Sequence, residues 1–221
     1  MPAGIITAIE IQKRNKERVN VYLDGEYAFS LEAIKAAALR KGQTLTEAEV
    51  NALRDEDEIG QAVDRAARFL SYRPRSTAEV RRNLADKDTP EPVIEAAVQR
   101  LNKMGYLDDR AFAKFWIENR TMFKPLSPRA LRYELRQKGV PAPVIDELLA
   151  EVDVRETAER AARTRLNRLR GSDHDTFRAK LSAFLQQRGF SYDTIRDVTE
   201  QLIEEIDTED EAYFREATNE E

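Results

Sequence analysis

The sequence predicts a mainly α-helical protein, in which a small N-terminal β-meander precedes three tandem three-helix repeats. Between residues 5 and 31, apolar residues alternate with others, as they do in strands with one buried face. Further on, the apolar spacing becomes helical, and residues 76–94 and 127–145 are identical at eight of nineteen positions. Related residues recur 50 positions later, around 181–195. A repeat of about 50 helical residues is typical of a helical array.

The N-terminal module is predicted to contain three antiparallel strands. They are expected near residues 5–11, 19–23 and 27–31. The dipeptide Asp24-Gly25 is a strong hairpin signal, because both residues of such a turn must accept a positive φ. The polar residues 13–17 form the other turn. So small a sheet needs a helix to cover its apolar face.

Two capping boxes mark where helices begin. Thr46 with Glu49, and Ser76 with Glu79, have the spacing at which each residue satisfies a free backbone N–H of the other. The helix that starts at the first box is expected to end just before Pro74, which cannot continue it.

Each repeat has a second helix with two apolar residues four positions apart, on one face. These pairs are Val80 and Leu84, Leu131 and Leu135, and Leu181 and Leu185. A turn follows, where Gly139 and Gly189 suit the left-handed residue of a helix C-cap, and Asp88 holds that place in the first repeat. We therefore predict five segments. They are the N-terminal module 1–58, the repeats 59–107, 108–153 and 154–206, and an acidic tail 207–221.

Composition and charge narrow the classes of function. The chain has no cysteine, so disulfides and thiolate metal sites are excluded. It has no apolar run long enough for a membrane span and no secretory signal pattern, so we expect a cytoplasmic protein. We also expect it to be a monomer. The net charge of −5 divides into −3 for residues 1–60, +6 for 61–202 and −8 for 203–221. A basic middle favours nucleic acid or an acidic protein as partner.

No residue pattern indicates catalysis, a metal or a cofactor. Asp108 and Asp109 stand at the start of a helix, where capping explains them. His174 is the only histidine, and one histidine cannot build a metal site. Phosphate-binding glycine loops are absent. Phe115 and Trp116 could stack on bases, but their helical spacing favours the core.

Basic residues recur at matching places in the repeats, which favours a basic stripe that binds a partner. The candidates are Arg73, Arg75, Arg81, Arg82, Arg120, Lys124, Arg132, Arg136, Lys138 and Arg188.

With the repeats aligned, the chain resembles the RecX family of recombinase regulators over nearly its whole length. The matching stretches are "FLSYRPRSTAEVRRNL", "LNKMGYLDDRAFAKFWIENR", "LRYELRQKGV" and "FLQQRGFSYDTI". Asp88 stands where the family usually has glycine. The resemblance implies an elongated, curved array and a non-enzyme. It also implies binding to the RecA filament on single-stranded DNA, with restraint of its ATPase, strand exchange and co-protease activity.

Two other interpretations remain open. One of the three-helix units could enter a DNA groove as a helix-turn-helix does, in a protein that acts directly on nucleic acid. The net negative charge argues against DNA as the sole partner. A generic helical scaffold is the weaker alternative. The sequence leaves open whether free single-stranded DNA is also bound.

Overall fold

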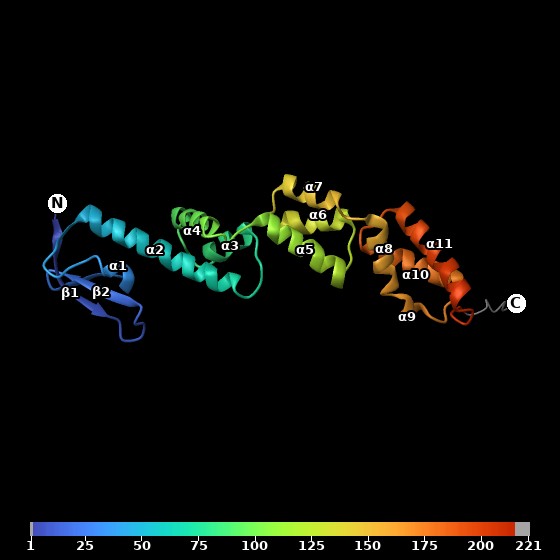
Figure 1. Cartoon of the computed structure of the whole chain (residues 1–221), viewed down its shortest axis with the longest axis horizontal. Helices are drawn as coiled ribbons and strands as arrows, with labels where there is room; N and C mark the ends of the chain where they lie inside the picture. Colours follow the sequence, from blue (N-terminus) through green and yellow to red (C-terminus); the bar gives the residue numbers. More distant parts are fainter. Residues whose placement is uncertain (1, 215–221) are drawn as a thin grey trace. The chain divides into compact units, whose positions relative to one another are not determined.

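The computed structural model describes residues 2–214, which form two compact units (Figure 1). The first unit consists of residues 2–73 and 79–107, and the second of residues 74–78 and 108–214. The strands are β1 (Pro2–Ile11), β2 (Arg18–Leu23), β3 (Glu26–Glu32) and β4 (Thr44–Thr46). The helices are α1 (Ala33–Ala36), α2 (Glu47–Leu70), α3 (Thr77–Ala85), α4 (Glu91–Lys103), α5 (Asp109–Phe123), α6 (Pro128–Gln137), α7 (Ala142–Ala150), α8 (Val154–Arg163), α9 (Leu166–Leu169), α10 (His174–Gln187) and α11 (Tyr192–Glu209).

The N-terminal sheet has four antiparallel strands in the order β3-β2-β1-β4, one more than predicted. The sequence did not reveal β4 because three residues are too few to show a period. The predicted turn is confirmed: Asp24 and Gly25 have φ values of 51° and 91°, as a two-residue hairpin turn with two positive φ angles requires.

A bulge in β1 changes which residues face the core. The register of β1 against β2 shifts between Ile6 and Ala8, so the simple alternation expected for residues 5–11 is interrupted. Ile6 is fully buried, whereas Ile5 and Ile11 are exposed. The predicted strand is correct, but its simple inward and outward pattern is not.

Helix α2 belongs to both the sheet and the first repeat. Its predicted capping box is present, since Thr46 and Glu49 each accept from the other's backbone N–H. The helix packs on β1 and β3 and then on α4 (Figure 1). The boundary expected between residues 58 and 59 therefore falls inside one continuous helix.

The three predicted helical repeats are confirmed. They consist of the later part of α2 with α3 and α4, of α5–α7, and of α8, α10 and α11 with the short α9. Each repeat has its own hydrophobic core. The apolar pairs predicted for the second helices are fully buried in all three cores, namely Val80, Leu84, Leu131, Leu135, Leu181 and Leu185.

The predicted left-handed turn closes the second helix of each repeat. Asp88, Gly139 and Gly189 have φ values of 54°, 76° and 84°. The N–H of the next residue donates back across the turn in each case: Thr89 to Leu84, Val140 to Leu135, and Phe190 to Leu185. This is the bond pattern of a Schellman cap.

A second role of the glycines is to let a neighbouring segment approach. A Cβ added to Gly139 would lie 2.4 Å from the Cβ of Ala78. One added to Gly189 would lie 2.7 Å from the Oγ of Ser127. The buried Ser76 and Ser127 therefore begin segments that pack, within the second unit, against the turn of the following repeat.

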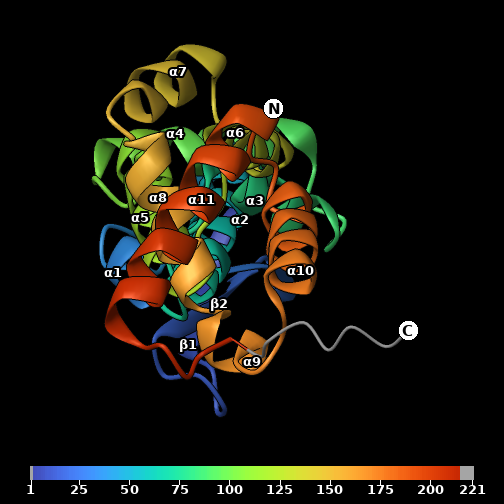
Figure 2. The same ribbon diagram turned by 90° about the vertical axis from the view of Figure 1, so that its right-hand side faces the viewer.

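The third repeat continues beyond its expected end. In Figure 2, α11 lies alongside α8 and α10, with α9 at one end. The helix continues to Glu209, and Tyr213 is buried, donating a hydrogen bond of 2.5 Å from its hydroxyl to the carbonyl of Leu166. Residues 207–214, expected to form an acidic tail, are thus folded. The rest of that expected tail, 215–221, lies outside the described residues.

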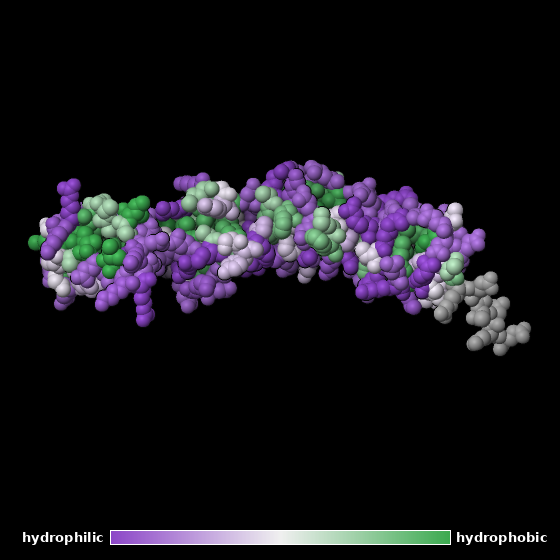
Figure 3. Space-filling view, turned by 60° about the horizontal axis from the view of Figure 1, so that its bottom comes forward, coloured by the Kyte–Doolittle hydropathy of each residue, from purple (hydrophilic) through white to green (hydrophobic). Residues whose placement is uncertain are grey.

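Among residues 2–214, none of the helices combines the length and apolar character that a membrane crossing needs. On the face drawn in Figure 3, hydrophobic surface gathers over the N-terminal sheet and in smaller patches over the helices, between hydrophilic stretches.

Candidate partner-binding surface

The second helix of the middle repeat presents basic side chains to solvent. In α6, Arg129, Arg132 and Arg136 follow one another at spacings of three and four, which places them on one face. Leu131 and Leu135 face the core. Arg129 and Arg136 are exposed, so this face of α6 is open to a partner.

Two of the predicted residues form equivalent ion pairs between second and third helices. Arg81 lies 2.5 Å from the Oε2 of Glu95, and Arg132 lies 2.9 Å from the Oδ1 of Asp146. The hydrogen bond from Arg81 lowers the pKa of Glu95. Ion pairs this exposed to solvent are weak and are screened by salt, so a partner's carboxylate can compete for the arginines.

Arg120 and Lys138 gather around the indole of Trp116. The Nε of Arg120 lies 2.7 Å from the Oε2 of Glu134, and the indole N–H donates to the same oxygen at 2.8 Å. The guanidinium of Arg120 and the ammonium of Lys138 lie 4.5 and 4.9 Å from the ring. These contacts stabilise the second repeat and occupy the ring.

The expectation that both aromatic residues of α5 belong to the core is half correct. Trp116 packs against the core of the second repeat, but Phe115 is 38% exposed. Successive helical residues point about 100° apart, so two neighbours rarely share one buried face.

Arg188 is held within the second unit rather than displayed on its surface. Its Nη1 donates to the carbonyl of Pro125 at 2.9 Å, and its guanidinium lies 4.5 Å from the ring of Phe184. Arg165 lies 4.3 Å from the same ring. Burial, and then the nearby charge of Arg165, lower the pKa of Arg188. Its role here is to join the second and third repeats.

The remaining candidates differ in exposure. Arg73 forms an ion pair of 2.9 Å with Glu79. Arg75 is half-buried in the segment 74–78, which belongs to the second unit. Arg82 and Lys124 are exposed.

The ten candidates thus divide into bases that are partly buried and bases that are exposed to solvent. The first unit holds Arg73, Arg81 and Arg82, and the second unit holds the other seven. Arg82, Lys124 and Arg136 are the exposed members. A single stripe through all three repeats stays a prediction.

Sequence reasoning missed two exposed aromatic residues at equivalent positions. Tyr72, just after α2, is 83% exposed, and Phe123, at the end of α5, is 74% exposed. Each precedes a base, Arg73 or Lys124, and then a proline. The signal was present as the matching stretches "SYRPRS" and "MFKPLS". Aromatic residues and arginine are among the residues that protein interfaces favour.

The adjacent carboxylates at the start of α5 act as caps. The Oδ1 of Asp108 accepts from the backbone N–H groups of Arg110 and Ala111. The Oδ1 of Asp109 accepts from the backbone N–H of Thr77 at 2.8 Å. Both carboxylates are thus engaged with backbone donors.

His174 is the first residue of α10. Its Nε2 lies 3.0 Å from the Oδ1 of Asp207, and its ring stacks on Phe214. Within the described part of the chain, no group of three or more histidine, aspartate or glutamate side chains has the arrangement of a metal site.

Comparison with known proteins identifies the family. Four RecX family models match the chain: the N-terminal domain at residues 4–46 and the first, second and third three-helix domains at 55–101, 108–149 and 151–199. The regulatory protein RecX of Bacillus subtilis is 34% identical over 212 residues, covering 93% of this chain and 80% of that protein. The chain belongs to the RecX family.

Other RecX proteins are also similar to this chain in sequence or in fold. A relative named regulatory protein RecX from Clostridium botulinum is 34% identical over 205 residues, covering 90% of this chain and 96% of its own. A RecX crystal structure matches 90% of this chain and all of its own, with a TM-score of 0.71 and 29% identity. RecX from Lactobacillus salivarius matches 67% of this chain and 98% of its own in fold, with a TM-score of 0.58 and 22% identity.

Proposed function

We propose that this RecX protein binds the RecA filament on single-stranded DNA and restrains its ATPase, strand exchange and co-protease activity. Membership of a family of regulatory proteins supports a regulator of RecA, and the repeated, exposed aromatic-base pairs support binding to a partner. We place this action in the cytoplasm, where the protein acts as a monomer without a cofactor.

The recurrence of Tyr72-Arg73 and Phe123-Lys124 in successive repeats is the observation that carries this proposal. A helical filament presents the same groups on every protomer at a regular spacing. A chain with repeated contact groups can meet successive protomers, so that each later contact is intramolecular and avidity rises by roughly 10² or more.

Direct reading of DNA by a third helix is less well supported. Helix α7 carries Asp146 and Glu147 and no base, and α11 exposes Asp193, Asp197 and Glu200. These carboxylates would repel the phosphates beside a groove.

The decisive experiment is a titration of this protein into RecA filaments while ATP hydrolysis is followed. Inhibition at a ratio well below one chain per RecA protomer, absent for RecA without DNA, is expected. Binding to single-stranded DNA alone is measured in parallel. An unchanged ATPase at saturating protein would contradict the proposal, and tight DNA binding without an effect on RecA would favour the alternative.

A further inference from the structure

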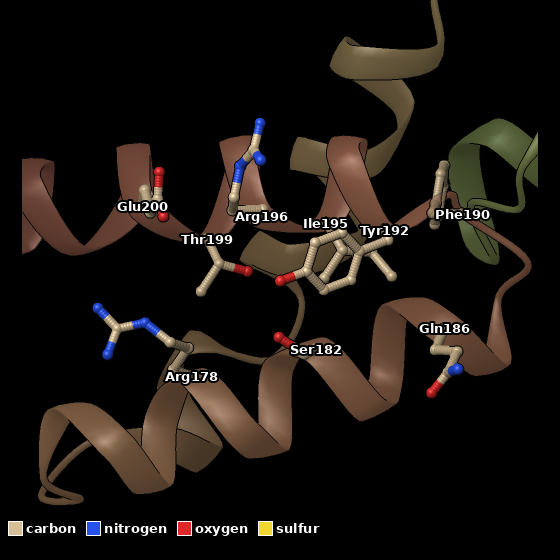
Figure 4. Close-up of a pocket in the computed structure, with 9 residues that line it drawn as sticks. All are labelled: Arg178, Ser182, Gln186, Phe190, Tyr192, Ile195, Arg196, Thr199 and Glu200. Atoms are coloured by element: carbon tan, nitrogen blue, oxygen red, sulfur yellow. The ribbon is translucent and has the colours of Figure 1, made fainter.

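The third repeat contains a groove between its second and third helices, α10 and α11. The cavity has a volume of about 290 Å³ (Figure 4). Its lining residues are Arg178, Ser182, Gln186, Phe190, Tyr192, Ile195, Arg196, Thr199 and Glu200.

In the other two repeats, an ion pair bridges the same two helices at this place. Arg132 and Asp146 correspond, at the repeat offset of 50, to Ser182 and Arg196. Serine is too short to bridge the helices, and Arg196 instead pairs with its neighbour Asp197 at 2.9 Å. Figure 4 shows Arg196 extending away from α10. The third repeat therefore lacks, between α10 and α11, a counterpart of the ion pair that bridges α6 and α7 in the second repeat.

The floor of the groove holds a polar group without a partner. The side chain of Thr199 is buried, with the residue only 2% exposed, and its Oγ1 makes no hydrogen bond. Leu149 and Val98 occupy the equivalent positions in the other repeats. In Figure 4 the side chains of Thr199 and Tyr192 both extend from α11 toward the space between α11 and α10. An unpaired buried hydroxyl is costly, so its presence points to a ligand that satisfies it.

The lining indicates the chemistry of the occupant. Phe190 and Ile195 offer apolar contact at one end, the Thr199 hydroxyl offers a hydrogen bond in the middle, and Arg178 stands at the far end (Figure 4). A cavity of this volume accepts one large side chain. A side chain with an apolar body and a hydrogen-bonding tip fits, with a carboxylate nearby for Arg178.

The charges around the groove favour protein over nucleic acid. Glu200 lines the groove, and Asp193 and Asp197 are exposed elsewhere on α11. A phosphate backbone is charged along its whole length and would meet these carboxylates. A protein segment can instead place a single carboxylate near Arg178, where it would compete with the ion pair of 3.3 Å between Arg178 and Asp175.

We propose that this groove receives a tyrosine- or tryptophan-like side chain from a segment of the partner protein, which, under the proposed function, is a RecA protomer in the filament. The third repeat thereby contributes a specific anchor, in addition to the contacts that repeat along the chain. Anchors of this kind, seated in a pocket, dominate binding at many interfaces.

The first test closes the groove with the protein's own ion pair. The double variant Ser182→Arg/Arg196→Asp copies Arg132 and Asp146 and lowers the net charge by one. Lys180→Gln, on the same helix outside the groove, is the charge-matched control. We expect filament binding about tenfold weaker for the double variant and unchanged for the control. Wild-type affinity in the folded double variant would overturn the inference.

A second variant, Thr199→Val, replaces only the hydroxyl by a methyl group. It tests the inference even if the double variant fails to fold. We expect weaker filament binding with an unfolding midpoint equal to or above that of the wild type. A purely structural role would change the midpoint and leave binding alone, which would overturn the inference.

The absence of cysteine from the chain allows a direct test of occupancy. Ser182→Cys and, as a control, Lys180→Cys each introduce one thiol, whose alkylation by a small reagent is timed. At a filament concentration about ten times the Kd, occupancy should slow alkylation at position 182 by about tenfold and leave position 180 unchanged. Equal rates with and without filament, or protection by single-stranded DNA alone, would overturn the inference. If the wild-type protein failed to inhibit RecA, the proposed function, on which this inference rests, would itself be contradicted.

Discussion

The hydroxyl of Ser76 donates a hydrogen bond of 2.5 Å to the backbone carbonyl of Lys138, 62 residues later. One repeat further on, the backbone N–H of Ser127 donates to the carbonyl of Arg188 at 3.1 Å. In both cases a buried serine meets the turn that ends the next repeat's second helix. The recurrence of this serine and of the glycine turns is thus explained partly by how the segments of the second unit pack.

Gly139→Ala should destabilise the protein more than Gly105→Ala. Both glycines have positive φ values, of 76° and 75°, so either substitution costs about 1 kcal/mol in backbone strain. Only at position 139 does the new Cβ meet another atom, the Cβ of Ala78 at 2.4 Å, whereas Gly105 faces open space. Chemical denaturation of the two variants gives the comparison. Equal losses would show that the approach of Ala78 is unimportant.

Leu135→Ala should lower the free energy of unfolding by about 2–5 kcal/mol, because it leaves a cavity in the core of the second repeat. Leu135 is fully buried. Tyr133→Ala, on the exposed face of the same helix, should change it by less than about 0.5 kcal/mol. Urea denaturation followed by circular dichroism measures both. A small loss for Leu135→Ala would contradict the assigned core.

The variant Tyr213→Phe should lose less stability at high pH than the wild-type protein does. Burial holds the pKa of Tyr213 above the ordinary value of about 10. A raised pKa means that folding favours the neutral phenol, so this stabilisation is complete below pH 10 and disappears as the pH rises through the folded pKa. Thermal midpoints between about pH 9 and 11 should therefore fall more steeply for the wild type than for the variant. Parallel curves would show that another group is responsible.

Truncation after Phe214 should strengthen partner binding slightly at low salt. The removed residues carry three acids and one base, a net charge of −2. Their repulsion of an acidic partner amounts to at most about 1 kcal/mol and is screened by salt. Binding at low and at high salt is the measurement. Truncation after Ile206 is the contrasting variant, and it should destabilise the third repeat by removing Tyr213.

Reversal of exposed bases should weaken inhibition of the filament ATPase without unfolding the protein. Lys124→Glu/Arg136→Glu is preferable to reversal of Arg132, which would also break the ion pair with Asp146. We expect about a tenfold loss, and a similar loss for Phe123→Ala. Lys13→Glu/Lys16→Glu, with the same change of charge in an N-terminal loop, is the control. Wild-type inhibition by all folded variants would exclude this surface as the binding site.

Periodic features of the fold could be predicted from the sequence, and features set by distant neighbours could not. Leu135 and Gly139 follow local rules of helix spacing and capping, so their places were correctly predicted. The folding of residues 207–214 could not be foreseen, because Tyr213 finds its partner at Leu166, far back in the chain. The acidic composition of this segment favoured a solvated tail, so the contact was not predicted.

The candidate binding surface, too, could be predicted from the sequence only in part. The sequence identifies which residues are basic but not which of them already have partners. Arg188 looks like a surface base until Pro125 and Phe184 are brought next to it. The pairs of Arg81 with Glu95 and Arg132 with Asp146 share a spacing of 14 residues, which the repeat alignment could have revealed.

The length of α2 has a consequence for how the protein unfolds. One continuous helix covers the sheet and then completes the first repeat, and ion pairs from Arg18 to Asp57 and from Arg100 to Glu56 hold its middle on both sides. The central part of α2 cannot unfold locally without exposing two hydrophobic cores, that of the sheet and that of the first repeat. We therefore expect the N-terminal sheet and the first repeat to unfold as one cooperative unit, with the amide hydrogens of both exchanging with solvent through the same opening.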